Sequence, residues 1–338
     1  MGRRARLLIG LGVALTCCQS APDAPSLSRT LYVAGRYVMG TVLEVQVFTS
    51  GGETARAASS AVFAETARLE AALSHYRPET DVSRLSRTAG TGPQEVAPEV
   101  TAALQRALEL GVLTQGAFDI TLGPVFASWR ESSSGEPSLA ALRARVGHDK
   151  IVVDPAGRVA LRVEGMALDL GAFAKGWSLD RAVALLRERA VDTALLSFGQ
   201  SSVWALGAPP GTEGWTLALQ APGGGVQGWV TLRDRALSFS SSRVPAELRS
   251  AADPPGRAPL VDPRTLRPVR RQATATLVGE DGALADALST ALLVLPPAQG
   301  RALVESLSGV EAMVVEEDGA VWASSRWQAW TRYRSARD

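Results

Sequence analysis

The chain has 338 residues and a formal net charge of +1, with 35 lysines and arginines against 34 aspartates and glutamates, and 46% of its residues are hydrophobic. This composition predicts a folded protein with a substantial core and excludes disorder as its main state. The near-neutral charge lacks the basic excess that nucleic-acid binding requires. Only two histidines and two adjacent cysteines are present, so a Ser-His-Asp hydrolase is poorly supplied and a Cys/His zinc site is nearly impossible.

The N-terminus has the layout of an export signal. Arginines at positions 3, 4 and 6 precede an apolar run over 7–15, which ends at Thr16-Cys17-Cys18. The pattern resembles a bacterial lipoprotein signal over residues 1–18, with Cys18 as the lipidated residue and Cys17 as a weaker alternative. A plain signal peptide cleaved nearby is the other interpretation. Either predicts an exported protein, and the lipid anchor would hold it on the periplasmic side of a bacterial membrane.

The rest of the chain divides into a short tether over 19–30, one folded domain over 31–325 and a C-terminal tail over 326–338. Hydrophobic periodicity predicts the following elements: a strand over 37–48, a helix over 54–74, a helix from 98 to about 114, a polar break over 131–137, a short helix over 138–146, short strands within 150–170, a helix from about 172 to 189, strands over 193–242, a strand over 272–278 and a helix over 283–295. Strands and helices do not alternate strictly, which predicts an α+β fold with mixed sheets and packed helices.

One helix carries a candidate cation site. Asp286 and Thr290 lie four residues apart, so their oxygen atoms project from the same helix face. Carboxylate and hydroxyl oxygens are hard donors that suit Mg²⁺ or Ca²⁺. The alternative is that Asp286 faces solvent while Thr290 bonds back to its own helix.

A second segment, Ala167–Gly176, passes from a strand through a glycine turn into a helix. A helix start offers N–H groups and a positive dipole end to a phosphate, and Lys175 adds a charge one turn in. Lysine is scarce in this chain, which favours a functional role for Lys175; a surface lysine beside a structural turn is the alternative.

Two loops complete the set of candidates. Gly116–Pro124 combines an aromatic side chain, a carboxylate and backbone groups, which suits an aromatic ligand that also forms hydrogen bonds. Val261–Thr265 is a turn signal led by Asp262, and a turn alone would explain it.

Taken in this order, the segments resemble the ApbE family, the FAD:protein FMN transferases. The matching blocks are Met39–Thr41, His75–Pro78 followed by Asp81–Leu85, the Gly116–Pro124 loop with Trp129, Asp169–Asp180, Val261–Thr265 and Ala285–Thr290. The resemblance implies an ApbE-like fold with a single FAD-binding catalytic unit. It also implies an activity in which Mg²⁺ assists transfer of FMN from FAD to a threonine of an acceptor protein, with release of AMP.

The resemblance also assigns residues to the site. It implies that FAD is bound by Met39, Tyr76, Ala117, Phe118, Asp119, Asp169, Lys175 and Val261. It implies that Mg²⁺ is held by the backbone carbonyl of Ala172 together with Asp286 and Thr290.

Several positions depart from the family pattern. Pro259 stands where the family has a histidine, and Leu266 stands where a glycine closes the motif. Ser197–Gln200 replaces an Asn-x-Gly-Gly segment, and Arg243 follows Ser242 in place of a glycine. Asp262 is therefore the candidate catalytic base. Because losing a general base lowers a rate by about 10²–10⁴-fold, two alternatives stay open: an FAD-binding lipoprotein that acts as a carrier or accessory, and an FAD pyrophosphatase.

Overall fold

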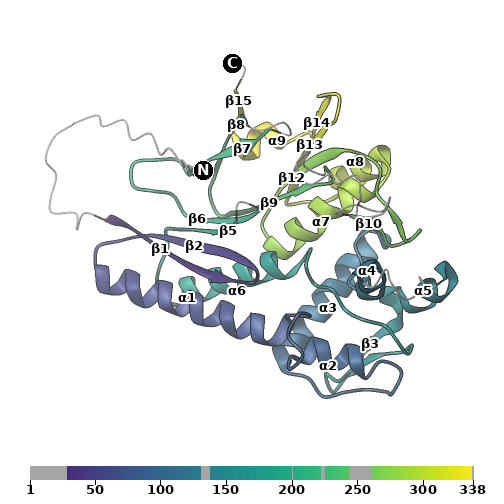
Figure 1. Ribbon diagram of the computed structural model, residues 1–338. Coiled ribbons are helices and arrows are strands. Elements are labelled where there is room, and N and C mark those ends of the chain that lie inside the picture. The colour runs from purple at the N-terminus through teal and green to yellow at the C-terminus, as the bar shows by residue number, and fades with distance from the viewer. Residues whose placement is uncertain (1–28, 131–137, 200, 222–224, 244–259, 337–338) are drawn as a thin grey trace, which may run out of the picture.

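The computed structural model describes residues 29–130, 138–199, 201–221, 225–243 and 260–336. Its centre is an eight-stranded sheet in the order β1-β2-β5-β6-β9-β12-β13-β14, in which every neighbouring pair is antiparallel. These strands are Thr30–Val38 (β1), Thr41–Thr49 (β2), Ala194–Phe198 (β5), Ser202–Leu206 (β6), Arg235–Ser241 (β9), Ala273–Gly279 (β12), Val310–Glu316 (β13) and Val321–Ala323 (β14). With the helices packed on it, the sheet confirms the predicted α+β class (Figure 1).

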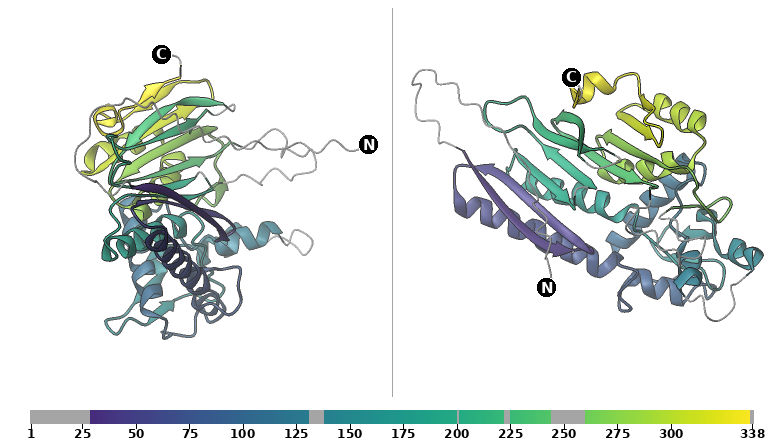
Figure 2. Two further views of the ribbon diagram at one scale, coloured as in Figure 1. Left: turned by 90° about the vertical axis from the view of Figure 1, so that its left-hand side faces the viewer. Right: turned by 45° about the horizontal axis from the view of Figure 1, so that its top comes forward.

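The two faces of the sheet bury different side chains. Helices α1 (Gly52–Leu73), α6 (Ala174–Glu188), α7 (Gly282–Val294) and α8 (Pro297–Ser306) pack on one face. A small sheet of β7 (Trp215–Gln220), β8 (Val226–Leu232) and β15 (Arg334–Ser335) covers the other with α9 (Trp327–Thr331) (Figure 2). In β5, for example, Leu196 faces the helices and Leu195 faces the small sheet, as the two-residue repeat of a strand requires.

A second core lies under the end of α1. It is built from helices α2 (Asp81–Arg87) and α3 (Pro98–Leu113) and the hairpin of β3 (Ile151–Val153) with β4 (Val159–Leu161), which follows the 3₁₀ turn η1 (His148–Lys150). A separate, smaller cluster joins helices α4 (Gly123–Arg130) and α5 (Leu139–Arg145) to the hairpin of β10 (Val261–Asp262) with β11 (Arg267–Pro268). Helix α7 contributes side chains to the second core as well as to the sheet core, which explains why it is apolar nearly all round.

The single strand expected over 37–48 was wrong. Met39 and Gly40 interrupt it, both with positive φ (52° and 74°), and form a two-residue turn between β1 and β2. Positive φ at both positions is the backbone of a type I′ hairpin turn. A hydrogen bond of 2.7 Å from the Met39 N–H to Glu70 Oε1 holds the turn against α1.

Helices α6 and α7 cross at two glycines. A Cβ atom added to Gly176 would lie 2.1 Å from the carbonyl oxygen of Gly282, so only glycine permits this approach. Burial raises the pKa of Asp180 to about 7, with the charge of Asp281 adding to the effect. Asp180 nevertheless accepts hydrogen bonds from the backbone N–H groups of Gly282 and Ala283 and so fastens the start of α7 to α6.

Some expected features lie outside the described residues: the signal over 1–18 with Cys17 and Cys18, most of the tether, the polar break over 131–137, and Pro259. The segment expected as a tail is described to residue 336, and its Trp327 is buried against the small sheet. In the described part of the chain, no helix combines the length and the apolar run that crossing a bilayer requires.

Candidate functional site

A cleft of about 540 Å³ opens where α6 and α7 meet the loops of the second core. Its lining combines aromatic and apolar side chains with carboxylates, a lysine and hydroxyls: Tyr76, Ala117, Phe118, Asp119, Leu122, Phe126, Asp169, Gly171, Ala172, Lys175, Ser201, Phe239, Ser240, Leu260, Val261, Pro263, Asp286 and Thr290. Seven separated stretches of sequence therefore converge on one space. Its size suits a nucleotide-sized ligand with an aromatic part.

The cleft brings together nearly all the predicted residues. Of the predicted FAD contacts, seven line it: Tyr76, Ala117, Phe118, Asp119, Asp169, Lys175 and Val261. The three predicted metal ligands, Ala172, Asp286 and Thr290, line it too. Met39 does not: its sulfur lies 3.4 Å from the hydroxyl of Ser178, and its backbone holds the β1–β2 turn.

Asp286 is buried rather than solvent-facing, with 4% of its surface exposed. Its Oδ1 accepts hydrogen bonds from the hydroxyls of Ser202 (3.2 Å) and Ser238 (3.0 Å), and its Oδ2 accepts one from the Gly176 N–H (3.1 Å). A carboxylate has about four lone-pair positions, so Oδ2 keeps one for a ligand.

Asp286, Thr290 and the Ala172 segment form one corner of the cleft, which we call the cation corner, and their oxygen donors fit a hard cation. No cluster of three or more His, Cys, Asp or Glu side chains suited to a metal occurs among the described residues. An ion bound here would therefore complete its shell with water and ligand oxygens, which is the usual habit of Mg²⁺.

Lys175 lies in the first turn of α6, at the positive end of the helix dipole. Its ammonium group lies 3.3 Å from the carbonyl oxygen of Gly171 and stays exposed at the cleft. The helix end and the ammonium group form a positive region beside the cation corner, which suits a pyrophosphate.

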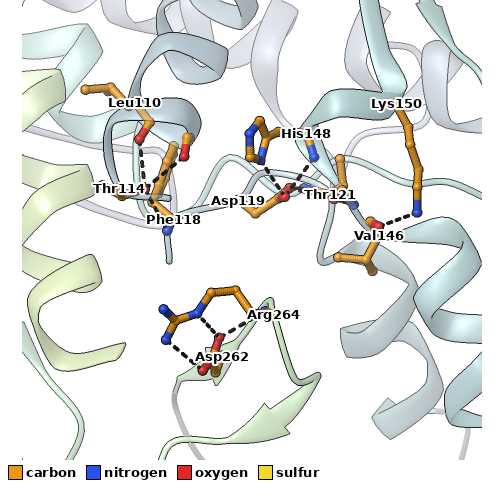
Figure 3. A network of polar contacts seen from close by, with 12 residues as sticks. Leu110, Thr114, Phe118, Asp119, Thr121, Val146, His148, Lys150, Asp262 and Arg264 are labelled. Carbon is orange, nitrogen blue, oxygen red and sulfur yellow. Dashed lines mark hydrogen bonds and ion pairs between the residues drawn. The ribbon is translucent and has the colours of Figure 1, made fainter. Parts of the chain in front are cut away.

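The Asp119 loop is held by a network of hydrogen bonds (Figure 3). Asp119 Oδ1 accepts from the N–H and the hydroxyl of Thr121, and Oδ2 accepts from the backbone N–H of His148 at 2.8 Å. The His148 Nδ1 atom lies 3.2 Å from the same oxygen. The network fixes the Ala117–Asp119 backbone against the wall of the cleft.

This contact makes His148 sensitive to pH. The hydrogen bond to Asp119 raises the pKa of His148 above 6.5, against the opposing effect of partial burial, and the charges of Asp119 and Asp149 add to the rise. The folded protein therefore binds this proton more tightly than the unfolded chain does. The resulting stabilisation is fully present below pH 6.5 and is lost as the pH rises through the folded-state pKa.

We accordingly expect the difference in Tm between the native protein and His148→Asn to shrink as the pH rises from 6 to 9. Asparagine keeps an amide donor but cannot take up a proton. Thermal denaturation at several pH values measures this difference, and the subtraction removes the contribution of Asp180. A difference that stays constant over this range would contradict the assignment.

Asp169 lies beside the Asp119 loop, because its N–H donates to the Ile120 carbonyl at 2.7 Å. Its Oδ1 accepts a hydrogen bond from the Gly171 N–H at 2.8 Å, which shapes the turn into α6. Its Oδ2 lies 3.6 Å from His75 Nε2. The His75 ring contacts the ring of Tyr76, with centroids 3.9 Å apart, and Tyr76 is 78% exposed at the rim of the cleft. Tyr76 thus offers a flat aromatic surface to a ligand.

The structure pairs Asp262, the candidate base, with Arg264. Its carboxylate binds the Arg264 guanidinium at 2.9 and 3.0 Å and also accepts from the Arg264 N–H, and it is not among the residues that line the cleft. Its carbonyl accepts from the Leu266 N–H at 2.7 Å, and Leu266 closes the turn with φ of 57°. This left-handed backbone explains why the motif favours glycine at that position.

Arg243 does not obstruct the described part of the cleft. Its guanidinium donates to the Glu316 carbonyl at 3.1 Å, at the end of β13, and it is absent from the lining. Gly199, in the segment that replaces Asn-x-Gly-Gly, has φ of 50° and packs closely against Thr41.

Sequence reasoning missed two groups of residues. One is His148, which only the fold brings to Asp119. The other is a set of serines around Asp286: Ser202, Ser238, Ser240 and Ser289. The alternation of Ser238 and Ser240 along a strand was the available signal, since it places both hydroxyls on one face.

The fold places a cleft whose size and lining suit an anionic ligand with an aromatic part. Residues 39–314 match the ApbE family, and the chain belongs to this family. A FAD:protein FMN transferase of Treponema pallidum is 28% identical over 341 residues, which cover 94% of this chain and 93% of the relative. Another, from Klebsiella pneumoniae, is 26% identical and covers 92% of this chain and 91% of the relative.

Solved structures agree with this placement. The apo form of the Pseudomonas stutzeri flavinyl transferase ApbE is similar to this chain with a TM-score of 0.78 and 26% identity, covering 89% of this chain and 97% of that one. The Vibrio cholerae flavin transferase ApbE shares the fold with a TM-score of 0.78 at 21% identity, covering 89% and 99%. The predictions of the family and of an enzyme of this class are confirmed.

Proposed function

We propose that this chain transfers FMN from FAD to a threonine hydroxyl of an exported or membrane redox protein, with Mg²⁺ as cofactor and AMP as the second product. The observation that carries the proposal is the convergence of the flavin and cation residues on one cleft, from five stretches of sequence. The names of the relatives support the same activity.

The residues of the cleft have different roles in the proposed reaction, according to their chemistry. Tyr76 and the buried Phe118 supply aromatic surface for the ring systems of the ligand. Lys175 and the start of α6 neutralise pyrophosphate charge. Asp286, Thr290 and the Ala172 carbonyl would hold Mg²⁺, which when bound polarises the phosphoryl oxygens and offsets the charge that develops on the leaving group.

The reaction balances without a redox partner. The threonine oxygen forms a bond to the phosphorus of the FMN half, the bond from that phosphorus to the oxygen bridging to AMP breaks, and the hydroxyl proton is released. Because Asp262 is paired with Arg264, the proposal relies on positioning and charge neutralisation rather than on a base at that residue.

The test combines the purified protein with FAD, Mg²⁺ and a candidate acceptor domain that contains threonine. The acceptor mass should increase by one FMN, with one AMP released per transfer. AMP and free FMN formed without an acceptor would instead establish an FAD pyrophosphatase. Tight FAD binding with neither product would leave the carrier or accessory role.

We further propose that the protein is anchored by a lipid on Cys18, on the periplasmic side of a bacterial membrane. Support comes from the sequence Thr16-Cys17-Cys18 after an apolar run. We expect Cys18→Ala to abolish incorporation of labelled fatty acid in cells, whereas the adjacent Cys17→Ala keeps it. Label that is lost only in Cys17→Ala would move the anchor to that residue.

A further inference from the structure

The serines behind the cation corner form a connected chain of hydroxyls. Ser240 Oγ lies 3.2 Å from Thr290 Oγ1 and 2.8 Å from Ser289 Oγ, and Ser289 donates to the backbone carbonyl of Asp286 at 2.9 Å. Ser289 is fully buried, whereas Ser240 lines the cleft. The chain therefore leads from the cleft surface into the interior.

The acceptor at the buried end of the hydroxyl chain, the Asp286 carbonyl, determines which hydroxyl donates in each hydrogen bond. Each hydroxyl has one hydrogen to donate, whereas a carbonyl or an ionised carboxylate only accepts. Once Ser289 donates to the Asp286 carbonyl, it can only accept from its hydroxyl neighbours Ser238 and Ser240, and Ser240 must then accept from Thr290. The Thr290 hydrogen points inward, and the lone pairs of its oxygen face the cleft.

The other branch acts on the Asp286 side chain. Ser202 and Ser238 both donate to Oδ1, which occupies that oxygen and leaves the free lone pair on Oδ2. The carboxylate is a stronger acceptor than the Ser201 carbonyl, which lies 3.3 Å from Ser238 Oγ. Ser202 on β6 and Ser238 on β9 thus orient Asp286, while Ser240 and Ser289 orient Thr290.

We propose that Ser240 and Ser289 are positioning residues of the cation site: they take up the hydroxyl hydrogen of Thr290 and so direct its lone pairs, with Asp286 Oδ2, at the metal ion. This inference rests on the proposed function in that it assumes a cation between these two side chains. Without Ser240, the Thr290 hydrogen would turn to the carbonyl of Asp286 four residues earlier, as threonines in helices often do, and its lone pairs would turn away from the ion.

The test measures metal binding without any turnover. Mn²⁺ is titrated into the purified protein, without FAD and then with it, and free Mn²⁺ is followed by electron paramagnetic resonance. We expect Ser240→Ala to bind Mn²⁺ about 10-fold more weakly than the native protein, within the range for residues that orient metal ligands. Ser240→Thr, which keeps the hydroxyl, should restore the affinity to within about threefold.

Two controls separate this effect from general damage. Ser241→Ala removes a neighbouring hydroxyl that accepts a hydrogen bond from the Arg243 N–H and takes no part in the chain, so its Mn²⁺ affinity should not change. The Tm of Ser240→Ala without metal should stay close to the native value. Native-like Mn²⁺ affinity in Ser240→Ala overturns the positioning role alone. Absence of Mn²⁺ binding in the native protein overturns the cation site and with it this inference.

Discussion

Asp286→Asn is expected to lower the rate of FMN transfer by about 10³-fold while changing Tm little. The amide has nearly the same shape, and the neighbouring serine hydroxyls can rotate to suit it, so the fold is kept. What is lost is the only carboxylate in the cation corner, and with it several kcal/mol of stabilisation of the charge on the leaving group. Acceptor mass and AMP release, measured against Mg²⁺ concentration, give the result directly.

Asp180→Asn is the control, since Asp180 is partly buried between α6 and α7 and its hydrogen-bond partners, Trp204, Gly282 and Ala283, do not line the cleft. Asp180 Oδ1 accepts hydrogen bonds from the Trp204 indole N–H and the Gly282 N–H, and Oδ2 accepts one from the Ala283 N–H. In the asparagine variant, the side-chain NH₂ group must replace one of these oxygens and would face an N–H donor instead of accepting from it. We expect this variant to lose about 1–3 kcal/mol of stability and to keep its transfer rate well below Tm. Equal loss of activity in both variants would show that Asp286 acts through the fold and not on the substrate.

Gly176→Ala is expected to have the largest effect on stability. The added Cβ would lie 2.1 Å from the Gly282 carbonyl oxygen and 2.9 Å from Asp286 Cβ, so the two helices must move apart. Overpacking against backbone costs about 3 kcal/mol or more, which corresponds to a fall in Tm of roughly 5–10 °C. Mn²⁺ affinity should fall as well, because the Gly176 N–H holds Asp286 Oδ2.

Gly35→Ala provides the comparison for this substitution. Its Cβ would meet only ordinary contacts, 3.7 Å from Val42 and 3.9 Å from the Leu43 carbonyl, and its φ is not in the left-handed region. Thermal denaturation of both variants should show a large loss for position 176 and almost none for position 35. Similar Tm values for the two would refute the close helix crossing.

A structural feature of this protein can be predicted from the sequence when the pattern that indicates it lies within a short stretch of the chain. The helices around Lys175 and Asp286 were predicted because apolar spacing is a local property, and the structure places them as α6 and α7. The turn at Met39 was missed because an apolar side chain with positive φ does not break a strand-like pattern. Residues next to a motif also affect its role. Arg264, two residues after Asp262, forms an ion pair with the carboxylate that the sequence analysis assigned to catalysis.

The serine chain and His148 could not be predicted by the same reasoning. Their partners come from different elements: Ser202 from β6, Ser238 and Ser240 from β9, and Ser289 from α7. No spacing rule connects residues that lie between 29 and 84 positions apart, as these partners do. Only the packing of α7 on the sheet converts scattered small polar residues into a network.

Helix α7 contributes side chains to both of the larger cores on its side of the sheet and carries Asp286 and Thr290 between them. The cation corner therefore lies where two packed cores meet on one rigid helix. A ligand bound there meets a site whose shape is already set by the surrounding packing. Under the proposed function, selectivity for the ion and the pyrophosphate is expected to come from rigid geometry rather than from closure around the ligand.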